Sequence, residues 1–160
     1  MDRLHRTLLL FGNDGTQKLR NASVMVVGCG AVGSFAIEAL ARTGIGHIIV
    51  VDFDNVEKSN INRQLFAMDS TVGLAKVDVA RCRIHDINPD THVDVYNIFW
   101  DDNTDLDVRP DFVIDAIDTV QSKIAIYQWC TKHSIPFISS MGAALKTDIS
   151  QIKIAPVSKT

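Results

Sequence analysis

Runs of apolar residues alternate with amphipathic stretches along most of the chain. Unbroken apolar runs predict buried strands, and apolar residues that recur every three or four positions predict helices. We therefore expect strands at 24–27, 48–51, 93–98, 112–117, 137–140 and 149–154, and helices at 2–11, 15–20, 31–43, 74–87 and 120–133. Strands that alternate with helices imply a mostly parallel sheet covered on both faces. The predicted class is an α/β, Rossmann-like, doubly wound fold.

Polar and glycine-containing stretches separate these elements. Gly12 should stop the first helix, Gly44 should cap the helix at 31–43, and Asn88 with Pro89 should end the helix at 74–87. Residues 54–70 form a long polar segment, and a loop of that length is more often functional than a plain connector. No linker or repeat divides the chain, so residues 1–160 are expected to form one domain.

A glycine-rich turn follows the first buried strand. Gly28, Gly30 and Gly33 form the pattern G-x-G-x-x-G, and Asp52 ends the next strand about 20 residues later. Gly28 would permit the tight turn, Gly30 would let a phosphate approach the backbone, and Gly33 would let the helix pack on the strand. The free N–H groups at the helix start suit an anion, and Asp52 suits ribose hydroxyls. The pattern predicts a nucleotide site.

Composition limits the class of protein and the cellular compartment in which this site is expected. The 46% apolar and 22% charged content is ordinary for a globular protein, and no apolar run reaches the ~18 residues of a membrane span. A net charge of −3 provides no overall basic footprint for nucleic acid, although a local patch remains open. Three cysteines without a C-x-x-C pair argue against disulfides and a zinc site, and favour a reducing, cytoplasmic location.

ATP and a nicotinamide dinucleotide both fit the glycine turn, and the residues after Asp52 bear on the choice. The following loop carries Asn60, Arg63 and Gln64, and Lys76 begins the next helix. Two added cations suit a triphosphate better than a pyrophosphate held mainly by backbone amides. Either cation taken alone would be read as solvated surface charge. Their position beside the expected mouth favours ATP, and an oxidoreductase remains an alternative.

Two aspartates mark the strand predicted at 112–117, one within it and one directly after it. Asp118 lies at its carboxyl end, where a carboxylate could hold Mg²⁺ that bridges the phosphates, or could instead cap the next helix. Asp115 interrupts the apolar run, and we interpret it as a buried hydrogen-bonding or capping residue rather than a metal ligand.

With these residues in view, the chain resembles the HesA/MoeB/ThiF group of the ubiquitin-activating superfamily over almost its whole length. The motifs that carry the resemblance follow in the family's order and spacing: Arg3-x-x-Arg6-Thr7 with Gly12, the Gly28–Gly33 turn, Asp52-Phe53-Asp54, Asn60-x-x-Arg63-Gln64, Gly73-Leu-Ala-Lys76, Ile87-Asn88-Pro89 and Asp115-x-x-Asp118. Several ordered motifs are far more specific than one glycine fingerprint. The resemblance implies adenylation, in which a carboxylate attacks the α-phosphate of ATP and releases pyrophosphate.

The resemblance also implies a role for each matching residue. The glycine turn with Asp52, Asp54 and Gln64 would hold the nucleotide, and the phosphates would be contacted by Asn60, Arg63 and Lys76. Asp118 would work with Mg²⁺ at the reacting phosphate. Arg6 would complete the site of a second protomer, which requires a homodimer. Arg6, Arg63 and Asp118 are thus the expected catalytic residues, and no membrane partner is expected.

Within the group, the chain is similar to the tRNA threonylcarbamoyladenosine dehydratase branch. Ala41-Arg-Thr-Gly-Ile-Gly46, Val72–Lys76, and Val113–Val120 with Lys123 carry that similarity. The branch activates the threonyl carboxylate of the modified adenosine beside the tRNA anticodon, and ring closure then expels AMP. The alternative is an adenylyltransferase for a ubiquitin-like sulfur carrier, whose partner would be a sulfur-carrier or cysteine-desulfurase-type protein. A nucleotide-binding module without catalysis is a further alternative.

The chain departs from the family in length. Relatives continue where this chain ends at Lys159 and Thr160, so we expect a C-terminally truncated adenylation domain. The remainder would supply much of the tRNA surface and, in modifier-activating relatives, paired zinc cysteines.

Overall fold

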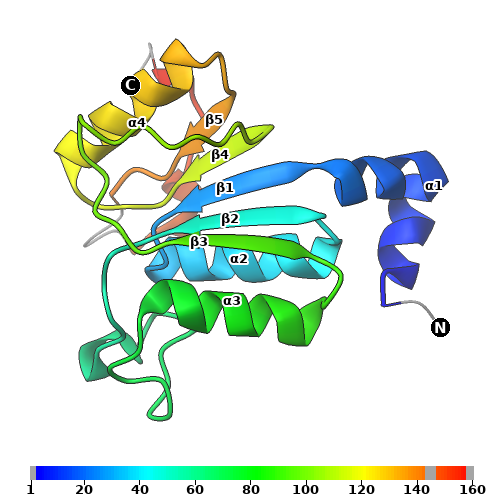
Figure 1. Ribbon diagram of the computed structural model, residues 1–160, viewed down its shortest axis with the longest axis horizontal. Coiled ribbons are helices and arrows are strands. Elements are labelled where there is room, and N and C mark those ends of the chain that lie inside the picture. Colours follow the sequence, from blue (N-terminus) through cyan, green and yellow to red (C-terminus); the bar gives the residue numbers. More distant parts are fainter. Residues whose placement is uncertain (1–2, 143–146, 158–160) are drawn as a thin grey trace.

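A five-stranded parallel sheet forms the centre of the computed structural model, which describes residues 3–142 and 147–157. The strands are β1 (Ser23–Val27), β2 (His47–Val51), β3 (His92–Tyr96), β4 (Phe112–Asp115) and β5 (Phe137–Ser139). They lie in the order β3-β2-β1-β4-β5, and every neighbouring pair is parallel (Figure 1). The order reverses between β1 and β4, and ligands bind at such a switch point in doubly wound sheets. The predicted fold class is confirmed.

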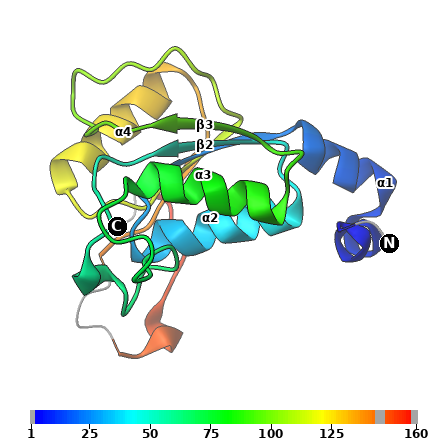
Figure 2. The same ribbon diagram turned by 60° about the horizontal axis from the view of Figure 1, so that its bottom comes forward.

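Three helices cover the two faces of this sheet. α2 (Ala31–Thr43) and α3 (Lys76–Ile87) lie on one face, and α4 (Val120–Lys132) lies on the other (Figures 1 and 2). Gly44 ends α2 in a left-handed conformation, as predicted for a capping glycine. Two short 3-10 turns, η1 (Lys58–Asn60) and η2 (Ile149–Gln151), interrupt the irregular segments.

The unbroken apolar strands are explained by burial on both faces. Along β1, Val24 and Val26 pack in the cluster on the α2 and α3 side, whereas Met25 and Val27 pack in the cluster with Trp129 on the α4 side. A strand between two helical layers needs an apolar residue at every position, since its successive side chains face opposite layers.

The first helix, α1 (His5–Asn21), lies beyond the amino-terminal ends of the strands (Figure 1). It is kinked at Gly12, whose φ of 69° breaks the helical course, so the two predicted helical segments on either side of this glycine are confirmed. Leu4 is buried and lies so close to Gly44 that a Cβ added there would come within 2.5 Å of its side chain. α1 is therefore held at the amino-terminal ends of the strands, and the glycine turn lies at the opposite, carboxyl ends.

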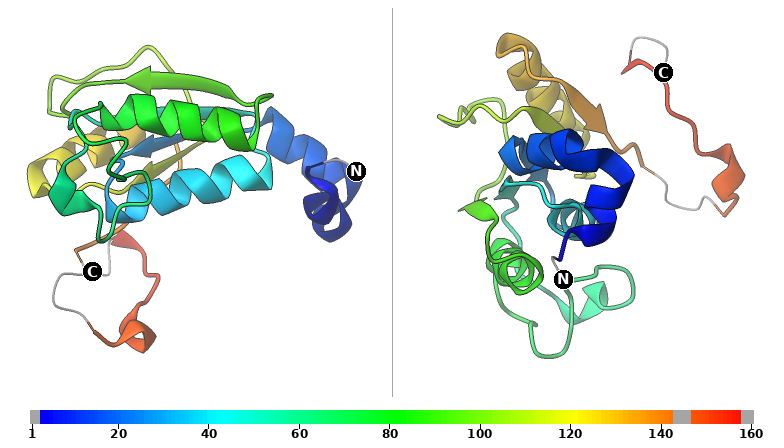
Figure 3. Two further views of the ribbon diagram at one scale, coloured as in Figure 1. Left: turned by 90° about the horizontal axis from the view of Figure 1, so that it is seen from below. Right: turned by 90° about the vertical axis from the view of Figure 1, so that its right-hand side faces the viewer.

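The prediction of a strand at 149–154 is wrong. This stretch begins with η2 and continues without strand pairing, and Figure 3 shows it extending away from the sheet. Ile149 and Ile154 are 83% and 91% exposed. Alternation of apolar residues stabilises a strand only where a neighbour supplies hydrogen bonds and a surface to cover, and no described strand lies beside these residues.

A buried ion pair joins β4, α4 and β5. Asp115 is 1% exposed, and both of its oxygens lie within 3.1 Å of the Lys123 ammonium. Ser139 also donates a hydrogen bond to the same carboxylate. Asp115 is therefore a buried hydrogen-bonding residue, which is the interpretation favoured from the sequence.

Loss of this ion pair should cost stability. Lys123→Met would leave the Asp115 carboxylate buried without its cation, and removal of one partner of a buried pair typically costs about 3–5 kcal/mol of unfolding free energy. Urea unfolding followed by circular dichroism measures this loss. Lys132→Met, which removes the exposed ion pair with Asp105, is the matched control and should change the midpoint far less. Equal shifts in the two variants would contradict the assignment.

Candidate nucleotide-binding site

A cavity of about 460 Å³ opens at the carboxyl ends of the strands. Its wall is built from residues that follow four of the strands, together with the glycine turn and the first residue of α3. The strands predicted at 93–98 and 112–117 end two residues early in the structure, because Ile98, Ala116 and Ile117 leave the sheet to line this cavity. The volume lies within the usual range for small-molecule sites.

The three fingerprint glycines differ in what an added side chain would meet: it would clash at Gly28 and Gly33, whereas Gly30 has free space beside it. Gly28 has a φ of +102°, and an added Cβ would lie 2.8 Å from the Ala116 carbonyl oxygen. A Cβ on Gly33 would fall 1.7 Å from the Gly28 oxygen, so this glycine permits close packing of α2 on β1 without lining the cavity. Gly30 lines the cavity, and the nearest atom to an added Cβ there is 3.9 Å away. Its backbone is open to a ligand.

Asp52 connects the glycine turn to the loop after β2. Its carboxylate accepts the backbone N–H of Cys29 at 2.6 Å and that of Asp54 at 2.8 Å. A carboxylate has about four acceptor positions, so these two bonds leave capacity for ribose hydroxyls. Burial, and then the charge of Asp52, raise the pKa of the Cys29 thiol well above its usual value. Cys29 therefore stays protonated and packs as a small buried side chain.

Lys76 enters the cavity wall from the first turn of α3. Its side chain is only 7% exposed, and its ammonium lies 2.7 Å from Asp54 Oδ2. The Lys76 backbone N–H donates to the Asp54 carbonyl, and a bridge between Asn55 and Ala75 holds the two segments together. A buried, anchored cation differs from the solvated surface lysine that the residue type alone would suggest.

The loop that carries η1 brings three further predicted residues to the cavity. Asn60 is 6% exposed, and its side-chain oxygen accepts the backbone N–H of Glu57 at 3.1 Å. Its carbonyl oxygen accepts the N–H groups of Arg63 and Gln64. The Arg63 guanidinium is exposed and donates to the Ser59 carbonyl and to Asn62 Oδ1, both at 3.0 Å. Asn60, Arg63 and Gln64 all line the cavity.

Asp118 lines the cavity from the segment between β4 and α4. Its side chain is exposed and makes no hydrogen bond or ion pair with the part of the chain that the structure describes. The N-cap of α4 is Thr119, so the capping role considered for Asp118 does not occur. Asp118 therefore presents an unpaired carboxylate at the mouth.

Arg6 does not join the other predicted site residues. It belongs to α1, which lies beyond the amino-terminal ends of the strands (Figure 1). Arg6 is exposed and is not one of the residues that line the cavity. A role in the cavity of its own chain is incompatible with this position, whereas a role in a second protomer stays a prediction.

Sequence reasoning missed a pair of phenylalanines that lines this cavity. Phe53 and Phe99 meet edge to face, with ring centroids 4.9 Å apart, and are each about half exposed. Trp100 also lines the cavity, and its buried indole N–H has no hydrogen-bond partner among the described residues. The sequence signal that could have revealed this pair is the position of Phe53, an apolar residue between the motif residues Asp52 and Asp54.

The sequence profile of the ThiF family matches residues 3–160. The chain belongs to the ThiF family. It is 48% identical over 163 residues to tRNA threonylcarbamoyladenosine dehydratase of Bacillus subtilis, covering 100% of this chain and 64% of that relative. The crystal structure of the Escherichia coli tRNA N6-threonylcarbamoyladenosine dehydratase in complex with ATP superposes with a TM-score of 0.95 at 41% identity, covering 99% of this chain and 66% of that one.

A relative of lower identity is named as an adenylyltransferase. The adenylyltransferase and sulfurtransferase MOCS3 of Drosophila sechellia is 35% identical over 150 residues, covering 91% of this chain and 33% of that relative. The chain therefore spans just under two thirds of the length of the Bacillus subtilis and Escherichia coli dehydratases named above, and a smaller share of this adenylyltransferase. No helix among residues 3–142 and 147–157 has the length and apolar character needed to cross a membrane.

Proposed function

We propose that this ThiF-family protein uses ATP to adenylate a carboxylate, and that the carboxylate is the threonyl group of threonylcarbamoyladenosine in tRNA. The observation that carries the proposal is the composition of the cavity wall, where the cations Lys76 and Arg63 stand beside the glycine turn and Asp52. Such cations suit a triphosphate. The name of the Bacillus subtilis relative, at 48% identity, supports the tRNA substrate, whereas the sulfur-carrier alternative is supported only by relatives of lower identity.

The charges of the wall fit a magnesium complex of ATP better than ATP alone. Among the residues that the structure describes, four carboxylates, those of Asp52, Asp54, Glu57 and Asp118, line the cavity with two cations, so a bare triphosphate would meet an excess of negative charge. Asp52 holds backbone N–H groups, Asp54 pairs with Lys76, and Glu57 accepts the Ser59 hydroxyl. Of the four, this leaves Asp118 without a partner among the described residues. Mg²⁺ is usually bound through one or two carboxylates plus phosphate oxygens. We assign Asp118 to that ion.

In the proposed reaction, the substrate carboxylate attacks the α-phosphate of ATP and pyrophosphate leaves. Ring closure on the resulting acyl-adenylate then expels AMP, for a net loss of water from the modified adenosine. Lys76 and Arg63 would stabilise charge that spreads over the phosphates, because phosphoryl transfer depends mainly on positioning and electrostatics. The half-exposed Phe53 and Phe99 offer apolar surface to a flat base.

The proposed assembly is a cytoplasmic homodimer in which Arg6 of one protomer reaches the cavity of the other. The dimer is supported by the position of α1, which carries Arg6 and lies at the end of the strands opposite the cavity. The cytoplasmic location is supported by the three cysteines, which are all free. A twofold-symmetric dimer is the commonest oligomer.

The Asp52→Ala variant tests nucleotide binding. We expect it to weaken ATP binding by about 1–3 kcal/mol, because ribose hydroxyls would lose their acceptor. Calorimetry with ATP and with NAD, each with and without Mg²⁺, measures this change. Asp86→Ala, an exposed carboxylate on α3 outside the cavity, is the control and should bind ATP as the unmodified protein does. Tight binding of NAD without binding of ATP would overturn the proposal.

A further inference from the structure

Two histidines and an aspartate gather on the sheet far from the nucleotide cavity. His47 is the first residue of β2, His92 is the first residue of β3, and these two residues are direct partners in the parallel pairing. Asp94 lies two positions along β3, so its side chain shares a face with that of His92. Because Asp52 follows the other end of β2, the cluster and the cavity lie at opposite ends of the strands.

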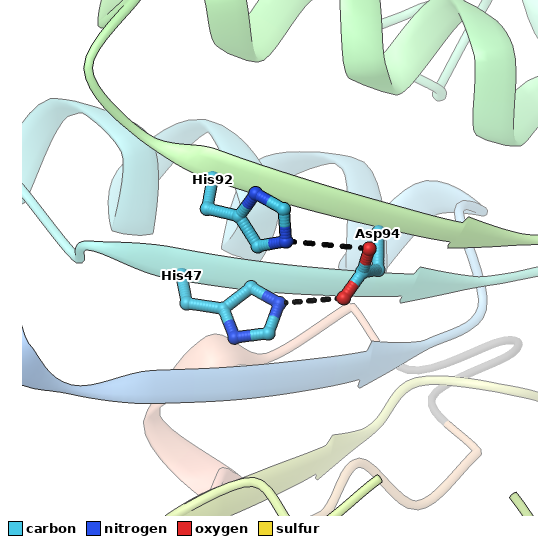
Figure 4. A group of neighbouring side chains, drawn as sticks. All are labelled: His47, His92 and Asp94. Atoms are coloured by element: carbon cyan, nitrogen blue, oxygen red, sulfur yellow. Dashed lines mark hydrogen bonds and ion pairs between the residues drawn. The ribbon is translucent and has the colours of Figure 1, made fainter. Parts of the chain in front are cut away.

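Both imidazole rings turn a nitrogen toward one carboxylate (Figure 4). His47 Nε2 lies 2.9 Å from Asp94 Oδ2, and His92 Nε2 lies 3.4 Å from Asp94 Oδ1. The ring centroids are 4.6 Å apart, and one ligand atom from each residue lies within 4.8 Å of the others. Neighbouring ligand atoms around a tetrahedral Zn²⁺ are separated by about 3.3 Å, given bond lengths near 2.0–2.1 Å. The two nitrogen–oxygen distances, each to a different oxygen of Asp94, lie close to that value.

The surroundings leave this carboxylate without a competing cation. Within the described chain, the ion pairs of Asp94 are with His47 and His92 and with no lysine or arginine. The side chains of His47, Asp94 and His92 are 30%, 38% and 68% exposed, so solvent can reach the cluster and supply a fourth ligand. Neutral histidine can give up the proton on Nε2 and keep one on Nδ1, which turns both facing nitrogens into metal ligands.

We propose that His47, His92 and Asp94 bind a divalent transition metal ion of the zinc type. Two imidazole nitrogens and one carboxylate oxygen form a set that zinc accepts with water in the fourth position. β3 is the edge strand of the sheet, and the ion would join it to β2 at the first residue of each strand. The site stabilises the sheet edge and stands apart from the adenylation chemistry, so its test does not depend on the proposed function.

Titration of the untagged, chelator-treated protein with Zn²⁺ tests this site. Competition against a chromogenic chelator should show one equivalent of Zn²⁺ bound, and Co²⁺ should give the visible absorption of a four-coordinate complex. His92→Ala, His47→Ala and Asp94→Asn should each weaken binding at least ~10-fold. A saturating excess of Zn²⁺, near 100 times the Kd, should raise the Tm by about 5–10 °C in the unmodified protein and not in these variants.

Two control variants separate this site from adventitious binding. His85→Ala removes an exposed histidine on α3, and His133→Ala removes the histidine that contacts Asp105, outside the proposed site. Both should retain the bound equivalent. The proposal is overturned if the unmodified protein binds no more Zn²⁺ than the His47→Ala/His92→Ala double variant, or if the controls weaken binding to the same degree. Circular dichroism of Asp94→Asn, a conservative change at a partly exposed position, confirms that lost binding is not lost folding.

Discussion

Adenylation by an Asp118→Asn variant is expected to be at least ~100-fold slower than that by the unmodified protein, on the order of 3 kcal/mol of transition-state stabilisation. Among the described residues, Asp118 is the cavity carboxylate that has neither a hydrogen bond nor an ion pair, and a metal held there would act mainly on charge that develops as the phosphate bond breaks. ATP binding should therefore fall only modestly. ATP–pyrophosphate exchange measures the first quantity, and calorimetry measures the second.

The control for this prediction is Asp102→Asn, an exposed aspartate that follows the cavity residue Trp100 but does not line the wall. It should leave both quantities unchanged. If Asp118→Asn reduced binding and exchange by the same factor, Asp118 would be a binding residue without a special role in the transition state.

Mixing two inactive variants should restore about a quarter of the activity. An Arg6→Ala protomer and an Asp118→Asn protomer are each expected to be inactive, since Arg6 is predicted to stabilise phosphate charge as an arginine finger does. Random exchange makes half of the dimers mixed. If Arg6 acts across the interface, one of the two sites in each mixed dimer holds both residues, and half of a half is one quarter.

The position of Arg6 motivates this experiment. α1 lies beyond the amino-terminal ends of the strands, whereas the cavity lies at their carboxyl ends, so Arg6 cannot complete the site of its own chain (Figure 1). Subunit exchange must be shown independently, for example with two differently labelled variants. Proven exchange without recovered activity would mean that Arg6 only packs.

The central fold was predictable because its signals are local. The apolar runs at 24–27 and 48–51 read directly as strands buried on both faces, and Gly12 and Gly44 mark real breaks in the helices. The stretch at 149–154 failed because the same alternation requires a neighbouring strand, which is a non-local condition.

The site was predictable where a motif fixes the backbone, and less so where a side chain depends on its partners. The loop residues Asn60, Arg63 and Gln64 reach the cavity as expected. The burial of Lys76 against Asp54 and the pairing of Phe53 with Phe99 arise from segments far apart in sequence. The same is true of the cluster around Asp94, where the pairing of β2 with β3 brings two histidines together.

Substrate-dependent release of pyrophosphate from ATP by the full-length protein tests the central claim most directly. The protein is incubated with ATP and Mg²⁺, and with either tRNA bearing threonylcarbamoyladenosine, the same tRNA lacking the modification, or a small protein that ends in Gly-Gly. The account predicts release of pyrophosphate with the modified tRNA alone, accompanied by loss of one water from its modified nucleoside. Release that depends on the Gly-Gly protein, or no release with the modified tRNA, would contradict it.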